Sequence, residues 1–543
     1  MRVRPGSAFR QLPLGSGPIV RPGRGVADSV APAVPFPAAG LSLRRLLPSV
    51  LALGLLAGGC RPAAALIRPP VPAPPAVGAG SPQLWVALAA HLGQGPLRLE
   101  GAAGPLQLVD GHGQRHSAAV LELRWRSVPL AQPLQLERQV LGPFPSFESA
   151  EQVALAWGRG GQGAVVAHPR DWEVWAEPGL MPPAGQRPRL QRLQLSRQLQ
   201  PELRSGGRWV RLEGPLQIQA PRGLRWQGGT FAGPFRLQAD AYGSWSLVEQ
   251  VPLERYLEGV LPHEIGASAP AAALAAQAVL ARTWALRNQH RFAVDGYHLC
   301  ADTQCQVYGD PRQAGAAVRQ AIRSTSGKVL ALEGRPIHAV YHASNGGISA
   351  DEHEAWPLPA LTYLEPALDL QGAAPPGLSG TIDSTTELRQ LLALRQGVAG
   401  SAHPLFRWRR QVDQSTLRQA LGARAAALGS PLRPVVLERG PSGRVVKLAI
   451  EGPTGRVVLE RDAIRRSLRL LPSTLFLLSA AGPGVWWFEG GGFGHGAGLS
   501  QAGAIDLAAR GWSVERILRH YYPGTSLLPL GALAPAKPSG GGL

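Results

Sequence analysis

Residues 252–290 read PLERYLEGVLPHEIGASAPAAALAAQAVLARTWALRNQH, and here the sequence pattern changes from strand-like to helical. The first ten residues predict a helix with one apolar face, formed by Leu253, Tyr256, Leu257 and Val260. Pro270 predicts the start of a second helix, because proline suits a first turn and no helix breaker follows for about twenty residues. The sequence therefore predicts two consecutive helices joined by a short corner at LPHEI.

Strand-like segments flank this helical region on both sides. Residues 209–251 alternate apolar and polar side chains in short runs, which is typical of strands with one buried face. After a further helix at 314–324 come strands such as VLALEG and IHAVYHAS, and residues 370–405 form a looser insertion with one helical stretch at 386–396. The mixture predicts the α+β class, with mixed twisted sheets that frame a groove and helices that flank it.

Residues 83–222, which precede these strands and helices, are rich in short β-type runs. They predict a β-rich N-terminal part. Within this region, helical spacing at 147–157 is followed by strand-like runs at 164–167 and 172–175. That order fits either a SPOR-like glycan-binding repeat or a plain βαβ-type insert.

Segments of biased composition bound the folded regions. Residues 66–82, rich in Pro, Ala and Gly, predict an extended, semi-rigid linker, and residues 531–543 a disordered tail. Residues 223–530 then form the main domain.

The N-terminus, residues 1–65, has the pattern of an extension followed by a secretory signal peptide. Two arginines precede an apolar run of 14 residues, 46–59, which is shorter than the ~20 that span a bilayer. Cys60 follows in LAGGC, which resembles a lipoprotein processing box except for Ala57, so a lipid anchor at Cys60 is an alternative to simple cleavage. The unusually long stretch 1–40 could reflect a start codon placed too early. We expect an exported protein of the periplasm or cell envelope.

The composition of the chain is strongly basic. The 543 residues include 55 Lys plus Arg against 36 Asp plus Glu, a formal net charge of +19. Hydrophobic residues make up 45%, which excludes a wholly disordered chain. The charge points to nucleic acid, a membrane surface or an acidic wall polymer, unless it reflects genomic base composition. Export argues against nucleic acid.

The corner LPHEI, residues 261–265, is the first cluster that could carry chemistry. A carboxyl group held there among Leu and Ile would lose hydration, which raises its pKa toward that of a general acid. Glu264 is therefore a candidate catalytic acid, and the alternative is a solvated glutamate in an interhelical loop.

The second cluster, residues 298–308, reads HLCADTQCQVY. Cys300 and Cys305, with His298 nearby, could bind zinc, although the local ligand set is incomplete and a further histidine would have to join it. In an exported protein the two cysteines could instead form a local disulfide.

Two further clusters combine polar side chains with glycines. YHASNGG (341–347) ends a strand, and its glycines would let a ligand approach the backbone. GGGFGHGAGLSQAGA (490–504) presents His495 in a glycine-rich loop before a helix that begins near Ser500. No Lys-Ser/Thr follows these glycines, so the loop is not a P-loop.

In this order the clusters resemble the SpoIID/LytB family. The resembling segments are VPLERYLEGVLPHEI, AAALAAQAVLARTWAL, CQVYGD, HASNGGISA, SGRVVKLAIEG, FGHGAGLSQAGA and ILRHYYPGT. The resemblance starts near residue 84, is strong from 223 and continues to about 528. It implies that residues 223–530 form a SpoIID-like catalytic domain.

Active members of this family are similar to lytic transglycosylases that act on peptidoglycan glycan strands, typically strands without stem peptides. The resemblance assigns the acid/base role to Glu264 and implies zinc ligation by Cys300 and Cys305, with His298 as a weaker third ligand. It also implies that other side chains of the family blocks line the substrate groove: Gln277, Arg282, Tyr308, His342, Ser344, His495, Ser500 and Gln501. Of these, His342, Ser344 and His495 could instead orient Glu264, and a structural role is the alternative for the side chains of these blocks.

The resemblance implies a second function as an alternative. LytB-type modifiers bind glycan and stimulate an N-acetylmuramoyl-L-alanine amidase without cleaving glycan themselves. The expected partners are therefore peptidoglycan strands and, for a modifier, a cell-wall amidase. Zinc is the one cofactor expected. The family name mentions sporulation, but nothing in the sequence shows that the organism forms spores.

Overall fold

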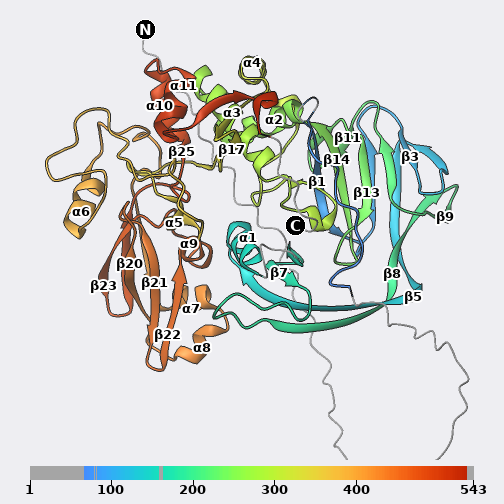
Figure 1. Cartoon of the computed structure of the whole chain (residues 1–543), viewed down its shortest axis with the longest axis horizontal. Helices are drawn as coiled ribbons and strands as arrows, with labels where there is room; N and C mark the ends of the chain where they lie inside the picture. Colours follow the sequence, from blue (N-terminus) through green and yellow to red (C-terminus); the bar gives the residue numbers. More distant parts are fainter. Residues whose placement is uncertain (1–65, 79, 81, 158–162, 535–543) are drawn as a thin grey trace, which may run out of the picture. The chain divides into compact units, whose positions relative to one another are not determined.

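The computed structural model describes residues 66–78, 80, 82–157 and 163–534. The predicted signal peptide, Cys60 and residues 535–543 of the predicted tail lie outside these residues. Helices and several curled sheets make up the described chain (Figure 1), so the predicted α+β class is confirmed. None of the helices in this part of the chain is long and apolar enough to cross a membrane.

The first sheet has seven strands in the order β15-β1-β14-β13-β10-β3-β4. The bounds of its strands are β1 Gln83–Leu92, β3 Leu106–Val109, β4 Arg115–Ala118, β10 Leu216–Gln219, β13 Phe235–Ala239, β14 Trp245–Pro252 and β15 Leu299–Cys300. Alternating side chains explain its buried face: in LQIQ of β10, Leu216 and Ile218 are buried and both glutamines are exposed. All neighbours are antiparallel except β1 and β15, whose parallel pairing sets Cys300 beside Ala87.

The second sheet has the order β12-β11-β2-β5-β7-β6, and β8 pairs with both β5 and β9. The bounds of its strands are β2 Leu97–Gly101, β5 Val120–Phe144, β6 Ala164–Ala167, β7 Trp172–Ala176, β8 Arg189–Ser205, β9 Arg208–Arg211, β11 Leu224–Trp226 and β12 Gly229–Phe231. The long strands β5 and β8 form an antiparallel ribbon that sweeps along one side of the molecule in Figure 1.

The insert after β5 contains the predicted helix and two strands, as α1 (Phe147–Ala156), β6 and β7. Ser146 caps α1, because its Oγ accepts a hydrogen bond from the main-chain N–H of Ser149 (3.2 Å). Strand β7 is antiparallel to both β5 and β6, so β5 and β6 run parallel with β7 between them. The insert is therefore a split βαβ unit.

The described part of the predicted linker is extended and contacts the folded body. The N–H of Leu66 donates to the carbonyl of Gln135, and the N–H of Glu137 donates to the carbonyl of Leu66. Further along, the N–H of Val77 donates to Oε1 of Gln289 (3.1 Å). These residues therefore lie against β5 and the end of the helical region.

The predicted helices at 252–261 and after Pro270 are confirmed as α2 (Leu253–Leu261) and α3 (Ala271–Arg287). The predicted apolar face of α2 is buried, and α3 is buried on every side from Ala273 to Leu286. The elements that pack against α3 are α4 Ala316–Ser324, α10 Gln501–Ala509, α11 Val514–Tyr521, β16 Lys328–Leu332 and β17 Arg335–Pro336, and β26 Ser526–Pro529 pairs with β16. We call α2, α3 and these elements the helical layer.

The C-terminal part adds two three-stranded sheets, β19-β24-β23 and β20-β21-β22, around a second apolar core. Its strands are β19 Trp408–Asp413, β20 Arg433–Arg439, β21 Val445–Gly452, β22 Gly455–Glu460, β23 Phe476–Gly482 and β24 Val485–Gly490. Its helices are α5 Glu352–Ala355, α6 Thr385–Ala393, α7 Gln414–Leu421, α8 Arg424–Leu428 and α9 Asp462–Ser467. The helix predicted at 386–396 is α6, which ends earlier because Leu394 is extended.

Two short parallel strands join the polar clusters of the sequence. β18 (Tyr341–His342) pairs with β25 (Leu499–Ser500), so that YHASNGG and the glycine-rich loop lie side by side. The loop is thereby set next to the corner between α2 and α3, where Tyr341 lies near Glu264.

Candidate functional site

Glu264 lies in a single π-helical turn, Pro262–Gly266, that follows α2 directly. Such turns inside helical segments are rare and are found frequently at functional sites. The chain then leaves the helix at Gly266, whose φ of +85° is accessible to glycine. This local geometry turns the Glu264 carboxyl toward the segment 303–307, where the main-chain N–H of Val307 donates to its Oε1 (2.9 Å).

The surroundings of Glu264 favour its protonated form. Burial raises the pKa of Glu264 from its usual 4.5 to about 7, although the hydrogen bond from Val307 acts in the opposite direction. The second oxygen, Oε2, has no hydrogen-bond partner among the described residues, and the side chain is partly exposed at the pocket wall. Glu264 can therefore both give and take a proton near neutral pH.

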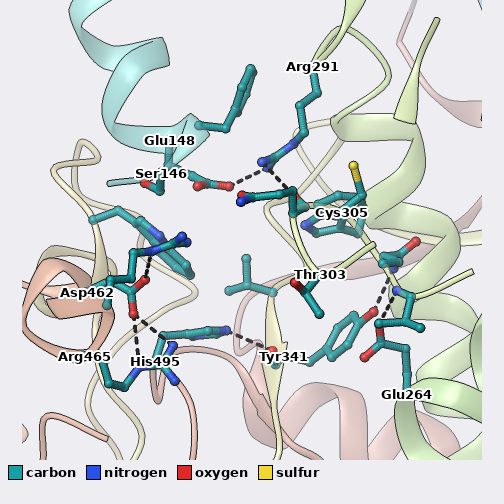
Figure 2. Close-up of a pocket in the computed structure, with 18 residues that line it drawn as sticks. Ser146, Glu148, Glu264, Arg291, Thr303, Cys305, Tyr341, Asp462, Arg465 and His495 are labelled. Atoms are coloured by element: carbon teal, nitrogen blue, oxygen red, sulfur yellow. Dashed lines mark hydrogen bonds and ion pairs between the residues drawn. The ribbon is translucent and has the colours of Figure 1, made fainter. Parts of the chain in front are cut away.

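A pocket of about 280 Å³ opens in front of Glu264 (Figure 2). Aromatic rings, carboxylates and guanidinium groups line it together. The lining residues are Ser146, Phe147, Glu148, Glu264, Trp284, Arg291, Thr303, Gln304, Cys305, Gln306, Val307, Val340, Tyr341, Trp356, Asp462, Arg465, Arg466 and His495. Aromatic rings together with many hydrogen-bonding groups suit a hydroxyl-rich ligand such as a sugar.

A hydrogen-bond chain lies next to the acid. The hydroxyl of Tyr256 donates to Oε1 of Gln306 (3.1 Å), and Nε2 of Gln306 donates to the hydroxyl of Tyr341 (2.9 Å). Burial first, and the negative charge of Glu264 second, raise the pKa of both tyrosines well above the usual range. Both phenols therefore stay protonated. We call Glu264, Gln306, Val307 and Tyr341 the acid wall.

The opposite side of the pocket is built from α1 and α9. Ser146, Phe147 and Glu148 come from the start of α1, and Asp462, Arg465 and Arg466 come from α9. We call these six residues the charged wall. Figure 2 shows its members Ser146, Glu148, Asp462 and Arg465 across the pocket from Glu264.

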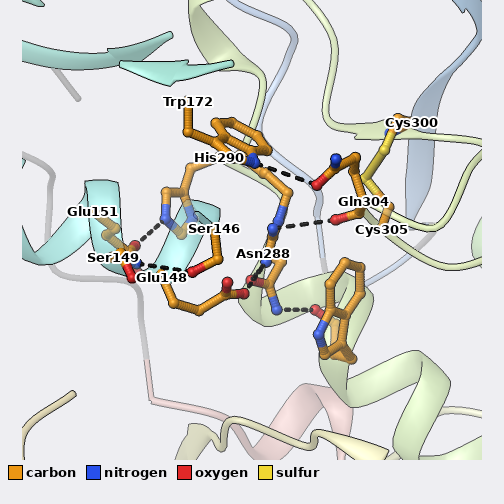
Figure 3. Close-up of polar contacts among 12 residues, drawn as sticks. Ser146, Glu148, Ser149, Glu151, Trp172, Asn288, His290, Cys300, Gln304 and Cys305 are labelled. Atoms are coloured by element: carbon orange, nitrogen blue, oxygen red, sulfur yellow. Dashed lines mark hydrogen bonds and ion pairs between the residues drawn. A yellow bond between two sulfur atoms is a disulfide. The ribbon is translucent and has the colours of Figure 1, made fainter. Parts of the chain in front are cut away.

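Ion pairs hold the α1 part of the charged wall. Nη2 of Arg291 donates to Oε1 of Glu148 (2.5 Å), and Nη1 donates to the carbonyl of Gln304 (3.2 Å; Figure 3). Burial by itself raises the pKa of Glu148, but the Arg291 guanidinium outweighs it and holds this pKa below its usual range. Arg291 thus fastens the insert to the loop that precedes Val307, and Glu148 is ionised.

The two candidate zinc ligands of that loop form a disulfide, Cys300–Cys305, which is the alternative that the sequence left open. Nδ1 of His298 accepts from the N–H of Trp85 (2.8 Å), so Nε2 carries the proton and donates to the carbonyl of Pro75 (2.9 Å). Among the described residues, no three or more His, Cys, Asp or Glu side chains gather as a metal site. Cys300, Cys305 and His298 therefore do not fit a zinc site in this arrangement, and Cys305 lines the pocket as part of the disulfide.

Of the eight side chains that the resemblance placed in the groove, His495 is the one that lines this pocket. Its Nδ1 accepts from the N–H of Ala497 (3.2 Å), so its Nε2 donates to the carbonyl of Tyr341 (2.9 Å). Burial, and next the charge of Arg465, lower the pKa of His495 to about 4. His495 is therefore a neutral ring that packs on Trp356 and positions the Tyr341 backbone.

Arg282, Tyr308 and Gln277 lie in the core instead of the pocket. Arg282 is fully buried and makes a bidentate ion pair with Glu254 (2.8 and 2.6 Å). The hydroxyl of Tyr308 donates to Glu249 (2.9 Å). Gln277 is fully buried on α3, and its Oε1 accepts a hydrogen bond from Nε2 of Gln501 (3.4 Å). These contacts stabilise the helical layer.

His342, Ser344, Ser500 and Gln501 are also buried and do not line the pocket. Nδ1 of His342 donates to the carbonyl of Ala497 (3.1 Å), and Ser344 pairs through its backbone with Phe493. Oγ of Ser500 caps α10 by accepting from the N–H of Gly503 (3.2 Å). Their contacts join the two polar clusters to each other and to α10.

The sequence reasoning missed most of the remaining lining. Gln306 and Val307 stand in the block CQVYGD, two residues and one residue before Tyr308, and this position was a usable signal. Trp356 and the pair Arg465 and Arg466 carried no such signal, because nothing local in the sequence marks them as near Glu264.

Comparisons with known proteins match the segment that contains Glu264. Residues 241–332, which contain the acid wall residues Glu264, Gln306 and Val307, match the SpoIID family model, described as stage II sporulation protein. Residues 350–498 match a domain of unknown function, DUF8618.

Three bacterial relatives match about half of the chain. Stage II sporulation protein D of Bacillus amyloliquefaciens is 29% identical over 300 residues, covering 52% of this chain and 75% of that protein. Stage II sporulation protein D of Bacillus subtilis is 28% identical over 296 residues, with the same two coverages. The amidase enhancer of Bacillus subtilis is 28% identical over 297 residues, covering 50% of this chain and 40% of that protein.

Proposed function

Since this chain belongs to the SpoIID/LytB family, we propose that it is an exported lytic transglycosylase, which cleaves MurNAc–GlcNAc bonds in peptidoglycan strands that lack stem peptides. The observation that carries this proposal is Glu264, a carboxyl group with a pKa of about 7 and one unpaired oxygen at the wall of a pocket lined by aromatic rings. A general acid works best when its pKa lies near the working pH.

Glu264 can serve both halves of such a reaction. Protonated, it donates its proton to the glycosidic oxygen, and the C1–O bond breaks while an oxocarbenium-like centre develops on the muramyl sugar. Ionised by that step, it accepts the proton of the 6-hydroxyl of the same sugar, whose oxygen attacks C1 and forms a 1,6-anhydro ring. Atoms and protons balance without water and without a second carboxylate as nucleophile.

The other two carboxylates of the pocket do not compete for the role of acid. Arg291 holds Glu148 ionised, and Arg465 and Arg466 hold Asp462 ionised against the effect of its burial. Glu264 is the lining carboxyl group with a raised pKa. This contrast in pKa supports the assignment of the acid.

The second candidate function is a modifier that binds glycan and stimulates an N-acetylmuramoyl-L-alanine amidase. The match to an amidase enhancer over half of this chain favours it. In that case the same pocket would hold a glycan strand without cleaving it. Export to the periplasm or envelope, with or without a lipid anchor at Cys60, belongs to both proposals, and the Cys300–Cys305 disulfide supports an oxidising compartment.

Digestion of purified glycan strands tests the proposal. We expect the wild-type protein to release 1,6-anhydro products, detected by mass, and Glu264→Gln to lower the rate by roughly 10²- to 10⁴-fold while still binding glycan. Glu258→Gln is the matched control, because it makes the same change on α2 outside the pocket lining. Unchanged product release by Glu264→Gln would remove this residue from the mechanism. A wild-type protein that releases nothing but accelerates an added amidase would favour the modifier.

A further inference from the structure

The α9 part of the charged wall contains more positive than negative charge. Oδ1 of Asp462 accepts from Nε and Nη2 of Arg465 (3.1 and 2.9 Å), and Oδ2 accepts from Nε of Arg466 (2.6 Å). One carboxylate thus faces two guanidinium groups. By contrast, Arg291, which also lines the pocket, is matched by Glu148.

The contacts with Asp462 leave donors unused. Nη1 of Arg465 and both Nη atoms of Arg466 have no hydrogen-bond partner among the described residues. The Asp462 side chain is 9% exposed, whereas those of Arg465 and Arg466 are 25% and 44% exposed. The carboxylate is therefore an internal anchor, and the guanidinium groups point donors toward the pocket that they line.

The position of these donors relative to Glu264 is informative. Figure 2 shows Arg465 and Asp462 on one side of the pocket, Glu264 on the other, and the rings of His495 and Tyr341 between them. The charge of Arg465 acts within this space, since it contributes to the lowered pKa of His495. A ligand that reaches from Glu264 across these rings would place its far group at the arginine pair.

We propose that Arg465 and Arg466 form a subsite for the free carboxylate of the lactyl group, which a muramyl sugar exposes when its stem peptide has been removed. This inference rests on the proposed function, because it names the form of glycan that the Glu264 pocket prefers. A guanidinium group matches the geometry of a carboxylate and binds it through charge-assisted hydrogen bonds. A stem peptide turns the same carboxylate into an amide, which removes the negative charge and adds bulk at that point.

Binding measurements separate the effect of charge from that of bulk. The ligand is a short MurNAc–GlcNAc oligosaccharide in two forms, one with free lactyl carboxylates and one with the same groups converted to methylamides. Glu264→Gln protein is used so that neither ligand is cleaved. We expect it to bind the free acid roughly 10- to 100-fold more tightly than the methylamide.

Substitution of both arginines tests the assignment. In the Glu264→Gln background, Arg465→Gln with Arg466→Gln should abolish the preference for the free acid while leaving affinity for the methylamide within about twofold. Arg466→Gln alone keeps the Arg465–Asp462 pair, serves if the double variant does not fold, and should reduce the preference severalfold. Arg469→Gln is the control, since Arg469 is exposed, follows α9 closely and does not line the pocket.

Two results would overturn the subsite: equal affinity of the unsubstituted arginine pair for both ligands, or a preference that survives the loss of both arginines. The cleavage proposal is judged separately, from products made by wild-type protein. Preferred binding of the free acid without anhydro products would support the subsite and argue against cleavage. Equal cleavage of both forms would support cleavage and argue against the subsite.

Discussion

The acid wall and the charged wall of the pocket are built in different ways. The acid wall is held by backbone geometry, since Glu264 is placed by a π-helical turn and a main-chain hydrogen bond from Val307. The charged wall is held by side-chain ion pairs between segments far apart in the chain, such as Glu148 with Arg291. The family model matches the segment that carries Glu264 and reaches neither α1 nor α9. The chemistry is thus encoded locally, while the shape and charge of the pocket are assembled from distant segments.

Because ion pairs hold the charged wall, the loss of one buried pair should lower the stability of the folded protein. Arg291→Met leaves the buried carboxylate of Glu148 without its cation, and we expect it to lower the free energy of unfolding by about 3–5 kcal/mol. Denaturant unfolding at constant m-value measures the change. Arg189→Met breaks a pair with Glu173 in which the arginine side chain is 57% exposed, and should cost less than about 1 kcal/mol. Equal effects of the two substitutions would show that the Glu148–Arg291 pair does not hold the charged wall.

The acid wall should respond to pH instead. The folded state keeps the proton of Glu264 up to a pKa of about 7, while an unfolded glutamate releases it near 4.5, so this contribution to stability is complete below pH 4.5 and lost as pH rises through 7. Glu264→Gln has no such loss. We therefore expect the variant to be more stable than the wild type by up to about 3 kcal/mol above pH 7, with the difference vanishing below pH 4.5. A constant difference from pH 4 to 9 would show that the carboxyl group is not buried as described.

The same pKa predicts the shape of the activity profile. Because only the protonated acid can start the reaction, kcat/KM on glycan should fall about tenfold per pH unit above pH 7. Rates on soluble glycan between pH 5 and 9 measure this limb. A tenfold fall per pH unit that has already begun at pH 5 would instead point to Glu148 or Asp462, whose pKa values the arginines hold below their usual range.

The sequence predicted the helices and the acid because both leave local marks. The apolar spacing of Leu253, Tyr256, Leu257 and Val260 predicted α2, and its single buried face confirms it. The corner after it singled out Glu264 as a carboxyl group that would lose hydration. These residues were enough for the prediction of the helix. For Glu264 the corner left a solvated glutamate as an alternative, and the resemblance to the SpoIID/LytB family supplied the acid/base role.

The remaining site residues could not be predicted in the same way. Helix α3 is apolar nearly all round and buried on all sides, so its sequence did not show which face meets the groove, and Arg282 points to Glu254 instead. Arg465 and Arg466 belong to a six-residue helix whose sequence resembles any short amphipathic turn. Their position depends on how the C-terminal sheets pack, which local patterns do not record.

The π-helical turn at Pro262–Gly266 also makes the length of this segment critical. An α-helix turns by about 100° per residue. A π-helical turn contains one residue more than an α-helical turn, because its hydrogen bonds join residues five apart instead of four. Deletion of His263 would restore the α-helical pitch and rotate Glu264 by roughly 100° away from the N–H of Val307. A single-codon deletion would therefore remove the function of Glu264 without replacing any residue of the pocket lining. The number of residues between α2 and α3 is thus itself part of the site.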